Sequence, residues 1–182
     1  MRWDELFRDL EGQLEAAESA DLAAEAADRT RREAARLTVL DRARGALGAR
    51  VLVQVLGAGR IDGVLLQVGG GWLLVGESAG RQALVPLPAV LALSGMSVRS
   101  AGAGPGGRVL DRLGLGHALR GLARDRATVS VMLIDGSTRA GTVDRVGADF
   151  LELHELPAGE VRGSAGLLTV PVAAVALVRS AS

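Results

Sequence analysis

The chain of 182 residues has no cysteine, no lysine and no tyrosine, and its only histidines are His117 and His154. The absence of cysteine excludes disulfides, thiolate nucleophiles and cysteine-based metal sites. The two histidines lie in unrelated sequence contexts, which makes a histidine-based metal site or catalytic triad an unfavourable interpretation. Because the usual nucleophiles and bases are so scarce, we expect a protein that is not an enzyme and that uses no cofactor and no metal.

Aromatic residues are almost as scarce, since the chain has only Trp3, Phe7, Trp72 and Phe150. Hydrophobic residues nevertheless make up 48% of the sequence, and 25 residues are glycine. This composition is typical of a packed globular chain with an aliphatic core and many turns. Trp72 and Phe150 alternate in phase with the apolar residues around them, so we expect both side chains in the core.

Long hydrophobic runs are also missing. No apolar stretch reaches the roughly 20 residues that a membrane-spanning helix needs. The first twenty residues are rich in charged side chains, unlike the apolar centre of a signal peptide. We therefore expect a soluble, cytoplasmic protein without a membrane partner.

Residues 1–36 contain no proline and are rich in alanine, glutamate, leucine and arginine, which predicts one long helix. Large apolar residues recur at steps of three and four and share one face, as Trp3, Phe7, Leu10 and Leu14 show. Acidic residues dominate the first part and arginines the second, an order that complements the helix dipole. We expect this face to bind a protein partner or a second copy of the chain, giving a homo-oligomer in the latter case.

The period of the apolar pattern changes after a short helical or turn-like stretch at residues 39–48. Alternating apolar residues begin at Val51, Val53 and Val55, and an alternating pattern of this kind is typical of a strand. The glycine-rich stretch 57–60 predicts a hairpin turn, and three further apolar segments follow it before residue 97. Pro86 and Pro88 interrupt the last segment, where a strand end is expected.

The stretch "QVGGGWLLV" at 67–75 resembles "RVGADFLEL" at 145–153, and this likeness extends over most of the chain. The matched residues lie 78 positions apart before the last loop and 85 apart after it. They are Val51, Val53 and Val55 with Val129, Val131 and Leu133; Gly63 with Gly141; Trp72 with Phe150; Val85-Pro86 with Val170-Pro171; and Val90 with Val175. Upstream, Arg44-Gly45 matches Arg120-Gly121. We predict an internal duplication, with copies at 37–97 and 110–182 joined by a glycine-rich linker at 98–109.

Each copy would consist of a short helix and five short strands. Strands this short have exposed edges unless the sheet curls into a small barrel. The stretch "VSVMLIDGSTRAGTVDRVGADFLEL" at 129–153 resembles the first motif of the Sm-like fold, within the wider group of SH3-like barrels. This resemblance implies a mainly β fold: a long N-terminal helix followed by two tandem five-stranded barrels.

The resemblance does not extend to the residues with which Sm-like proteins bind RNA. That family holds uracil with an Asp-x-x-x-Asn stretch and a later Arg-Gly or Lys-Gly. The corresponding stretch between Asp144 and Asp149 has no asparagine, and "TVPVAAV" stands where the basic dipeptide would be. The fold is therefore expected without the usual RNA-binding pocket. Asp144 and Asp149 are interpreted as turn residues rather than catalytic carboxylates.

Arginine clusters offer the alternative function, an RNA- or DNA-associated factor. Arg29, Arg32 and Arg36 lie on one helical face, and a second group follows at Arg112, Arg120, Arg124 and Arg126. Arginines bind phosphates without reading sequence. The competing interpretation is a solvated face with ion pairs between Glu25 and Arg29 and between Asp28 and Arg32. The favoured function is a non-enzymatic interaction or adaptor protein, with the nucleic-acid factor as the alternative.

Overall fold

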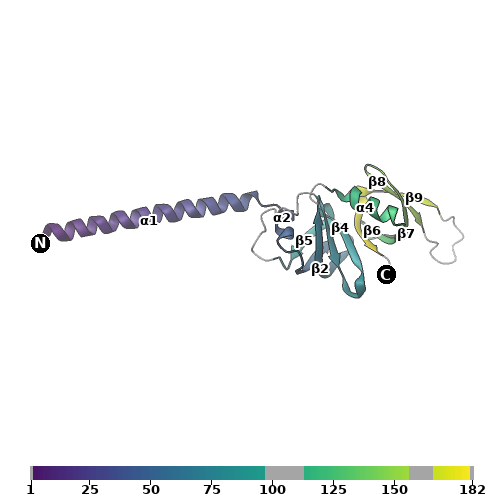
Figure 1. Ribbon diagram of the computed structural model, residues 1–182, viewed down its shortest axis with the longest axis horizontal. Coiled ribbons are helices and arrows are strands. Elements are labelled where there is room, and N and C mark those ends of the chain that lie inside the picture. The colour runs from purple at the N-terminus through teal and green to yellow at the C-terminus, as the bar shows by residue number, and fades with distance from the viewer. Residues whose placement is uncertain (1, 97–112, 156–165, 181–182) are drawn as a thin grey trace. The chain divides into compact units, whose positions relative to one another are not determined.

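The computed structural model describes residues 2–96, 113–155 and 166–180 (Figure 1). The chain divides into two compact units, Met1–Thr38 and Val39–Ser182. The predicted linker at 98–109 lies outside the described residues. All described strands belong to the second unit, so the protein is mainly β with a few helices.

The first unit consists of helix α1, Arg2–Arg36. Glutamate, alanine and arginine are strong helix formers, and the helix contains no proline and only one glycine. The side chain of Phe7 is 58% exposed and that of Leu22 is 67% exposed. No helix within the described ranges is long and apolar enough to cross a membrane.

Within the described residues, ten antiparallel strands form a single sheet in the order β5-β1-β2-β3-β4-β10-β6-β7-β8-β9 (Figure 1). The strands of the first half are β1 Arg50–Val55, β2 Gly59–Gly69, β3 Trp72–Gly76, β4 Gln82–Pro86 and β5 Val90–Ser94. Those of the second half are β6 Thr128–Leu133, β7 Thr138–Val146, β8 Phe150–Glu155, β9 Leu167–Pro171 and β10 Val175–Ser180. Pairing between β4 and β10 joins the strands of the two halves into this one sheet.

The two halves have the same order of elements at the spacings found in the sequence. Strands β1 and β6 begin 78 residues apart, at Arg50 and Thr128, and β4 and β9 begin 85 apart, at Gln82 and Leu167. The bulges correspond as well: one residue is skipped between Leu65 and Gln67 in β2, and one between Val143 and Arg145 in β7. Local geometry thus follows the sequence correspondence even where the side chains differ.

Short helices lie at equivalent places in the halves. Helix α2, Val39–Arg44, packs against β2, and helix α4, Leu115–Arg124, packs against β7. The short 3₁₀ turns η2, Leu87–Ala89, and η3, Val172–Ala174, each connect the last two strands of a half. A further 3₁₀ turn, η1, Ser78–Gly80, joins β3 to β4.

The described residues contain two clusters of buried apolar side chains, and each takes residues from both halves. The cluster of the first half includes Ala176 and Leu177 of β10, and the cluster of the second half includes Trp72 and Leu84. Among the described residues, no polar or charged residue is buried. Burial of aliphatic area is therefore the main stabilising term in both clusters.

Gly63 and Gly141 lie in the middle of β2 and β7, where the backbone of the next strand approaches closely. A Cβ atom on Gly63 would lie 2.2 Å from the carbonyl oxygen of Gly76, and one on Gly141 would lie 2.2 Å from that of His154. Such a distance is far below van der Waals contact, so only glycine fits without movement of the backbone. A glycine in the middle of a strand is typical of such a close approach of backbones.

We predict that Gly141→Ala destabilises the fold by about 1–3 kcal/mol, as overpacking against a backbone oxygen does elsewhere. Gly121→Ala is the matched control, because nothing lies within 4 Å of a Cβ at this helical position. Alanine there should be neutral or stabilise by up to about 1 kcal/mol. Urea unfolding would measure both, and equal effects of the two substitutions would contradict the packing account.

Candidate functional site

The two halves of the sheet meet at β4 and β10, where Leu84 is paired with Val178 and Ala83 with Arg179. A bidentate ion pair lies beside this junction. The guanidinium of Arg179 donates from Nε and Nη2 to the carboxylate of Glu77, at 2.8 and 3.0 Å. The side chains of Arg179 and Glu77 are only 29% and 12% exposed, so solvent screens this pair less than a fully exposed one.

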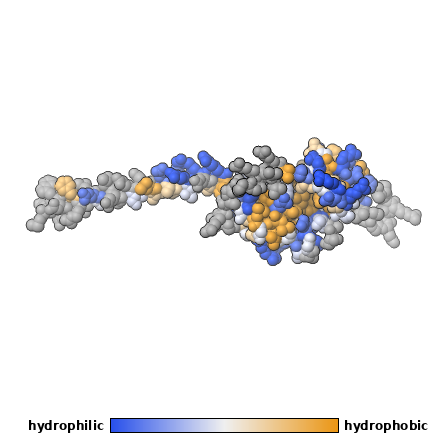
Figure 2. Space-filling view, viewed as in Figure 1, coloured by the Kyte–Doolittle hydropathy of each residue, from blue (hydrophilic) through white to orange (hydrophobic). Residues whose placement is uncertain are grey.

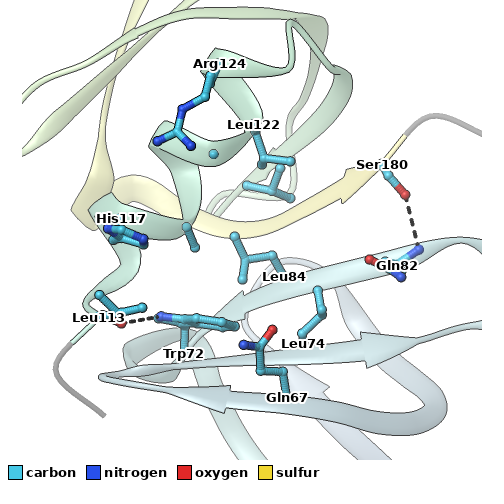
Figure 3. A pocket seen from close by; sticks show the side chains of 13 residues that line it. Gln67, Trp72, Leu74, Gln82, Leu84, Leu113, His117, Leu122, Arg124 and Ser180 are labelled. Atoms are coloured by element: carbon cyan, nitrogen blue, oxygen red, sulfur yellow. Dashed lines mark hydrogen bonds between the residues drawn. The ribbon is translucent and has the colours of Figure 1, made fainter. Parts of the chain in front are cut away.

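Hydrogen bonds extend the junction on both sides of the strand pair (Figure 3). The backbone N–H of Gln82 donates to Oγ of Ser180 at 3.2 Å. The indole Nε1 of Trp72 donates to the carbonyl oxygen of Leu113, just before α4, at 2.8 Å. The indole therefore fixes the entry of α4 against the first half of the sheet.

An apolar cavity of about 410 Å³ lies at this junction. Figure 3 shows Leu84 near its centre, with Trp72 on one side and Leu122 of α4 on the other. The complete lining is Gln67, Trp72, Leu74, Gln82, Leu84, Leu113, His117, Ala118, Gly121, Leu122, Arg124, Val178 and Ser180. His117 and Arg124, both exposed, contribute from α4, and Gln67, Gln82 and Ser180 from the strands. The lining offers van der Waals contact and a few hydrogen-bonding groups.

The structure confirms Trp72 as a core residue and corrects the expectation for Phe150. Trp72 is 5% exposed and belongs to the cluster of the second half. Phe150 occupies the equivalent position but is only partly buried, and neither core cluster includes it. The difference has a physical cause: the segment before α4 covers Trp72, and no corresponding described segment covers Phe150.

The predicted nucleic-acid residues whose side chains are described are all exposed. Arg29, Arg32 and Arg36 lie on α1, and Arg120 and Arg124 lie on α4. The expected intrahelical pairs are present, since Arg29 contacts Glu25 at 3.3 Å and Arg32 pairs with Asp28. Arg120 donates to the carbonyl oxygen of Gly147 at 3.4 Å, and Arg112 lies outside the described residues.

The predicted partner-binding residues Trp3, Phe7, Leu10 and Leu14 all belong to α1. Of their side chains, only that of Phe7 is described, and it is exposed. The side chains of Trp3, Leu10 and Leu14 lie outside the described set.

Two exposed aspartates have a pKa below the usual value. The Arg50 guanidinium lowers the pKa of Asp62 by donating a hydrogen bond at 2.9 Å. The hydroxyl and the backbone N–H of Ser137 lower the pKa of Asp135, which closes the turn between β6 and β7. Both interactions hold local backbone geometry. Both Asp144 and Asp149 are exposed. Asp149 lies in the bend just before β8, as expected of a turn residue, whereas Asp144 lies within β7 at its bulge, so the expected turn is wrong for Asp144.

The residues that form the junction were not predicted from the sequence; they are Glu77, Ala83, Leu84, Leu113 and Arg179. The sequence did contain one indication that these two strands are central in the sheet. Leu84 and Val178 belong to uninterrupted apolar runs, at 83–86 in β4 and 175–178 in β10, which is typical of strands buried on both faces. The partner of each strand could not be read from that pattern.

No protein-family model matches the chain, and a search of curated proteins found no match to it.

We predict that Trp72→Ala destabilises the fold by about 3–5 kcal/mol, the usual cost of truncating a buried aromatic residue. Phe150→Ala serves as the matched comparison from the other half. Its cost should be only about 1–2 kcal/mol, because its side chain retains contact with solvent. Urea unfolding of both variants tests the difference, and a cost for Phe150 equal to that for Trp72 would contradict it.

Proposed function

We propose that the protein is a non-enzymatic interaction or adaptor protein that binds a protein partner, or a second copy of itself, through α1. The observation that carries this proposal is the exposure of apolar side chains on α1. Phe7, on the predicted face, is 58% exposed, and the described residues of the first unit include no other helix or strand that could cover it. Helices in proteins draw most of their stability from the packing of an apolar face. An exposed apolar face on α1 therefore favours binding to a partner.

We also propose that each half of the sheet is a small barrel of the Sm-like or SH3-like type. The strand orders β5-β1-β2-β3-β4 and β10-β6-β7-β8-β9 are equivalent, which supports one repeated unit. The bulges in β2 and β7, together with the mid-strand glycines Gly63 and Gly141, favour strong bending of the sheet at matching places. On this proposal the barrels form a rigid scaffold, and α1 binds the partner.

The second candidate function is association with RNA or DNA. The exposure of Arg29, Arg32 and Arg36 on α1 favours it. The pairs Arg29–Glu25 and Arg32–Asp28 weigh against it, because a phosphate contact of Arg29 or Arg32 would have to replace an existing ion pair.

Replacing Trp3, Phe7, Leu10 and Leu14 together by serine should abolish partner binding through α1 and leave the second unit folded. Light scattering of the purified chain and affinity purification from nuclease-treated cell extract would measure this. Leu22→Ser is the control, since it changes an exposed leucine of the same helix outside the predicted face. Identical masses and identical bound proteins for the quadruple variant and the unsubstituted chain would refute the proposal.

Nucleic-acid binding through the arginines should weaken steeply with salt, because each phosphate contact releases a counterion. Changing Arg29, Arg32 and Arg36 to alanine should then lower the affinity for a short single-stranded RNA and reduce the salt dependence. Fluorescence anisotropy at low salt measures both quantities. If the unsubstituted chain binds no RNA even at low salt, the second candidate function is eliminated.

A further inference from the structure

The apolar cavity beside the junction has no role in binding through α1, because its lining includes no residue of that helix. Its volume of about 410 Å³ lies within the range of about 300–1,000 Å³ that is typical of small-molecule sites. Trp72 and Leu84 line it and keep 5% and 6% of their surface exposed, whereas the next residues along the same strands, Leu73 and Val85, are fully buried. The cavity is therefore open to solvent.

The wall of the cavity is neutral where the equivalent place in the second half is charged. Gln67 and Leu74 face each other across β2 and β3. Their equivalents in β7 and β8 are Arg145 and Glu152, which form an ion pair at 3.1 Å. The repeated unit thus accepts a charged pair at this position, and the neutral pair keeps the cavity apolar. Figure 2 shows a similar difference on the surface: apolar residues gather over the first half, around the strands labelled β2 and β5 in Figure 1, and hydrophilic residues over part of the second.

Polar side chains line the cavity on two sides (Figure 3). His117 and Arg124 of α4 lie on one side, and Gln82 and Ser180 of the strands lie on the other. The lining includes one charged side chain, that of Arg124, and no carboxylate. Within the described part of the chain, Arg124 forms no ion pair. An anionic group on a ligand would therefore find a complementary charge at this side of the cavity.

Gly121 lies between the two polar residues of α4. His117, Gly121 and Arg124 follow one another at steps of four and three, so they share one face of the helix over two turns, about 10.5 Å along its axis. Nothing lies within 4 Å of a Cβ atom built on Gly121. The glycine therefore leaves open space at the cavity wall, between an imidazole and a guanidinium that can both form hydrogen bonds.

We propose that the cavity binds a small amphipathic carboxylate, whose apolar body lies against Trp72, Leu84 and Leu122 and whose head group binds Arg124 beside Gly121. A guanidinium binds a carboxylate through two parallel hydrogen bonds. One arginine balances one negative charge, which favours a carboxylate over a phosphate monoester of about −1.5 to −2 charges. The volume lies near the lower end of the usual range, so the cavity fits one short apolar body and not the two chains of a membrane lipid.

The test uses the complete chain with Trp3→Phe, which leaves Trp72 as its only tryptophan. Decanoate, below the concentration at which it forms micelles, should change the fluorescence of Trp72 up to saturation, and calorimetry should give one molecule bound per chain. The absence of both signals would overturn the proposal without affecting the role proposed for α1. Binding in the calorimeter without a change at Trp72 would place the decanoate elsewhere, and it would overturn the proposal as well.

Selectivity for the head group tests the role of Arg124. Decanol has the same chain without a charge, so it should bind at least about tenfold more weakly than decanoate. Arg124→Gln should weaken decanoate binding by a similar factor and leave decanol binding unchanged. Arg120→Gln is the matched control, because Arg120 belongs to the same helix but does not line the cavity. Equal losses of both ligands in Arg124→Gln, or tighter binding of decyl phosphate than of decanoate, would contradict a carboxylate site at Arg124.

Gly121→Leu tests where the apolar body lies. Leucine favours helix and would fill the open space at the cavity wall, so both decanoate and decanol should bind at least about tenfold more weakly to a folded chain. Gly116→Leu is the matched control in the same helix. Gly116 does not line the cavity, and the atom nearest to a Cβ there belongs to the flexible side chain of Arg120, at 3.7 Å.

The Gly116→Leu variant should bind both ligands like its parent, and circular dichroism should show both glycine variants folded. Equal affinities of the two variants for decanoate would refute the proposed location. The comparison of Arg124→Gln with Arg120→Gln does not depend on either glycine variant, so it decides the proposal even where leucine at residue 121 prevents folding.

Discussion

The pairing of β4 with β10 is the contact on which the rest of the second unit depends. It joins two five-stranded halves into one sheet and fixes the residues that each half contributes to the other's core. Ala176 and Leu177 enter the first core because β10 lies beside β4, and Trp72 and Leu84 enter the second for the same reason. The ion pair between Arg179 and Glu77 is partly removed from solvent, and it holds the register between β4 and β10.

The same junction explains why the apolar cavity lies where it does. The side chains of Trp72, Leu84 and Leu122 converge there from the first half, the junction strand and α4. Two curved halves that meet along only one strand pair leave space between the sheet and the covering helix. The cavity is thus a consequence of joining two units, since its walls come from both halves.

The succession of strands along the chain and the spacing of the halves could be predicted from the sequence, because alternation, turn glycines and the 78-residue match are local or repeated signals. The close approaches at Gly63 and Gly141 were predictable for the same reason. The pairing of Leu84 with Val178 was not predictable, because many apolar strands of similar length could have formed that contact. The burial of Phe150 was predicted wrongly, since it depends on what covers the ring and not on the alternation in its own strand.

The position of β10 has a consequence for synthesis on the ribosome. This strand follows every other described strand in chain order, yet it lies next to the middle of the sheet. All five strands of the first half therefore leave the ribosome before Ala176 and Leu177, which belong to the core of that half. Its β4 edge stays available for mispairing until the last strand arrives, so translation of the C-terminal part sets how long the nascent chain is exposed to aggregation.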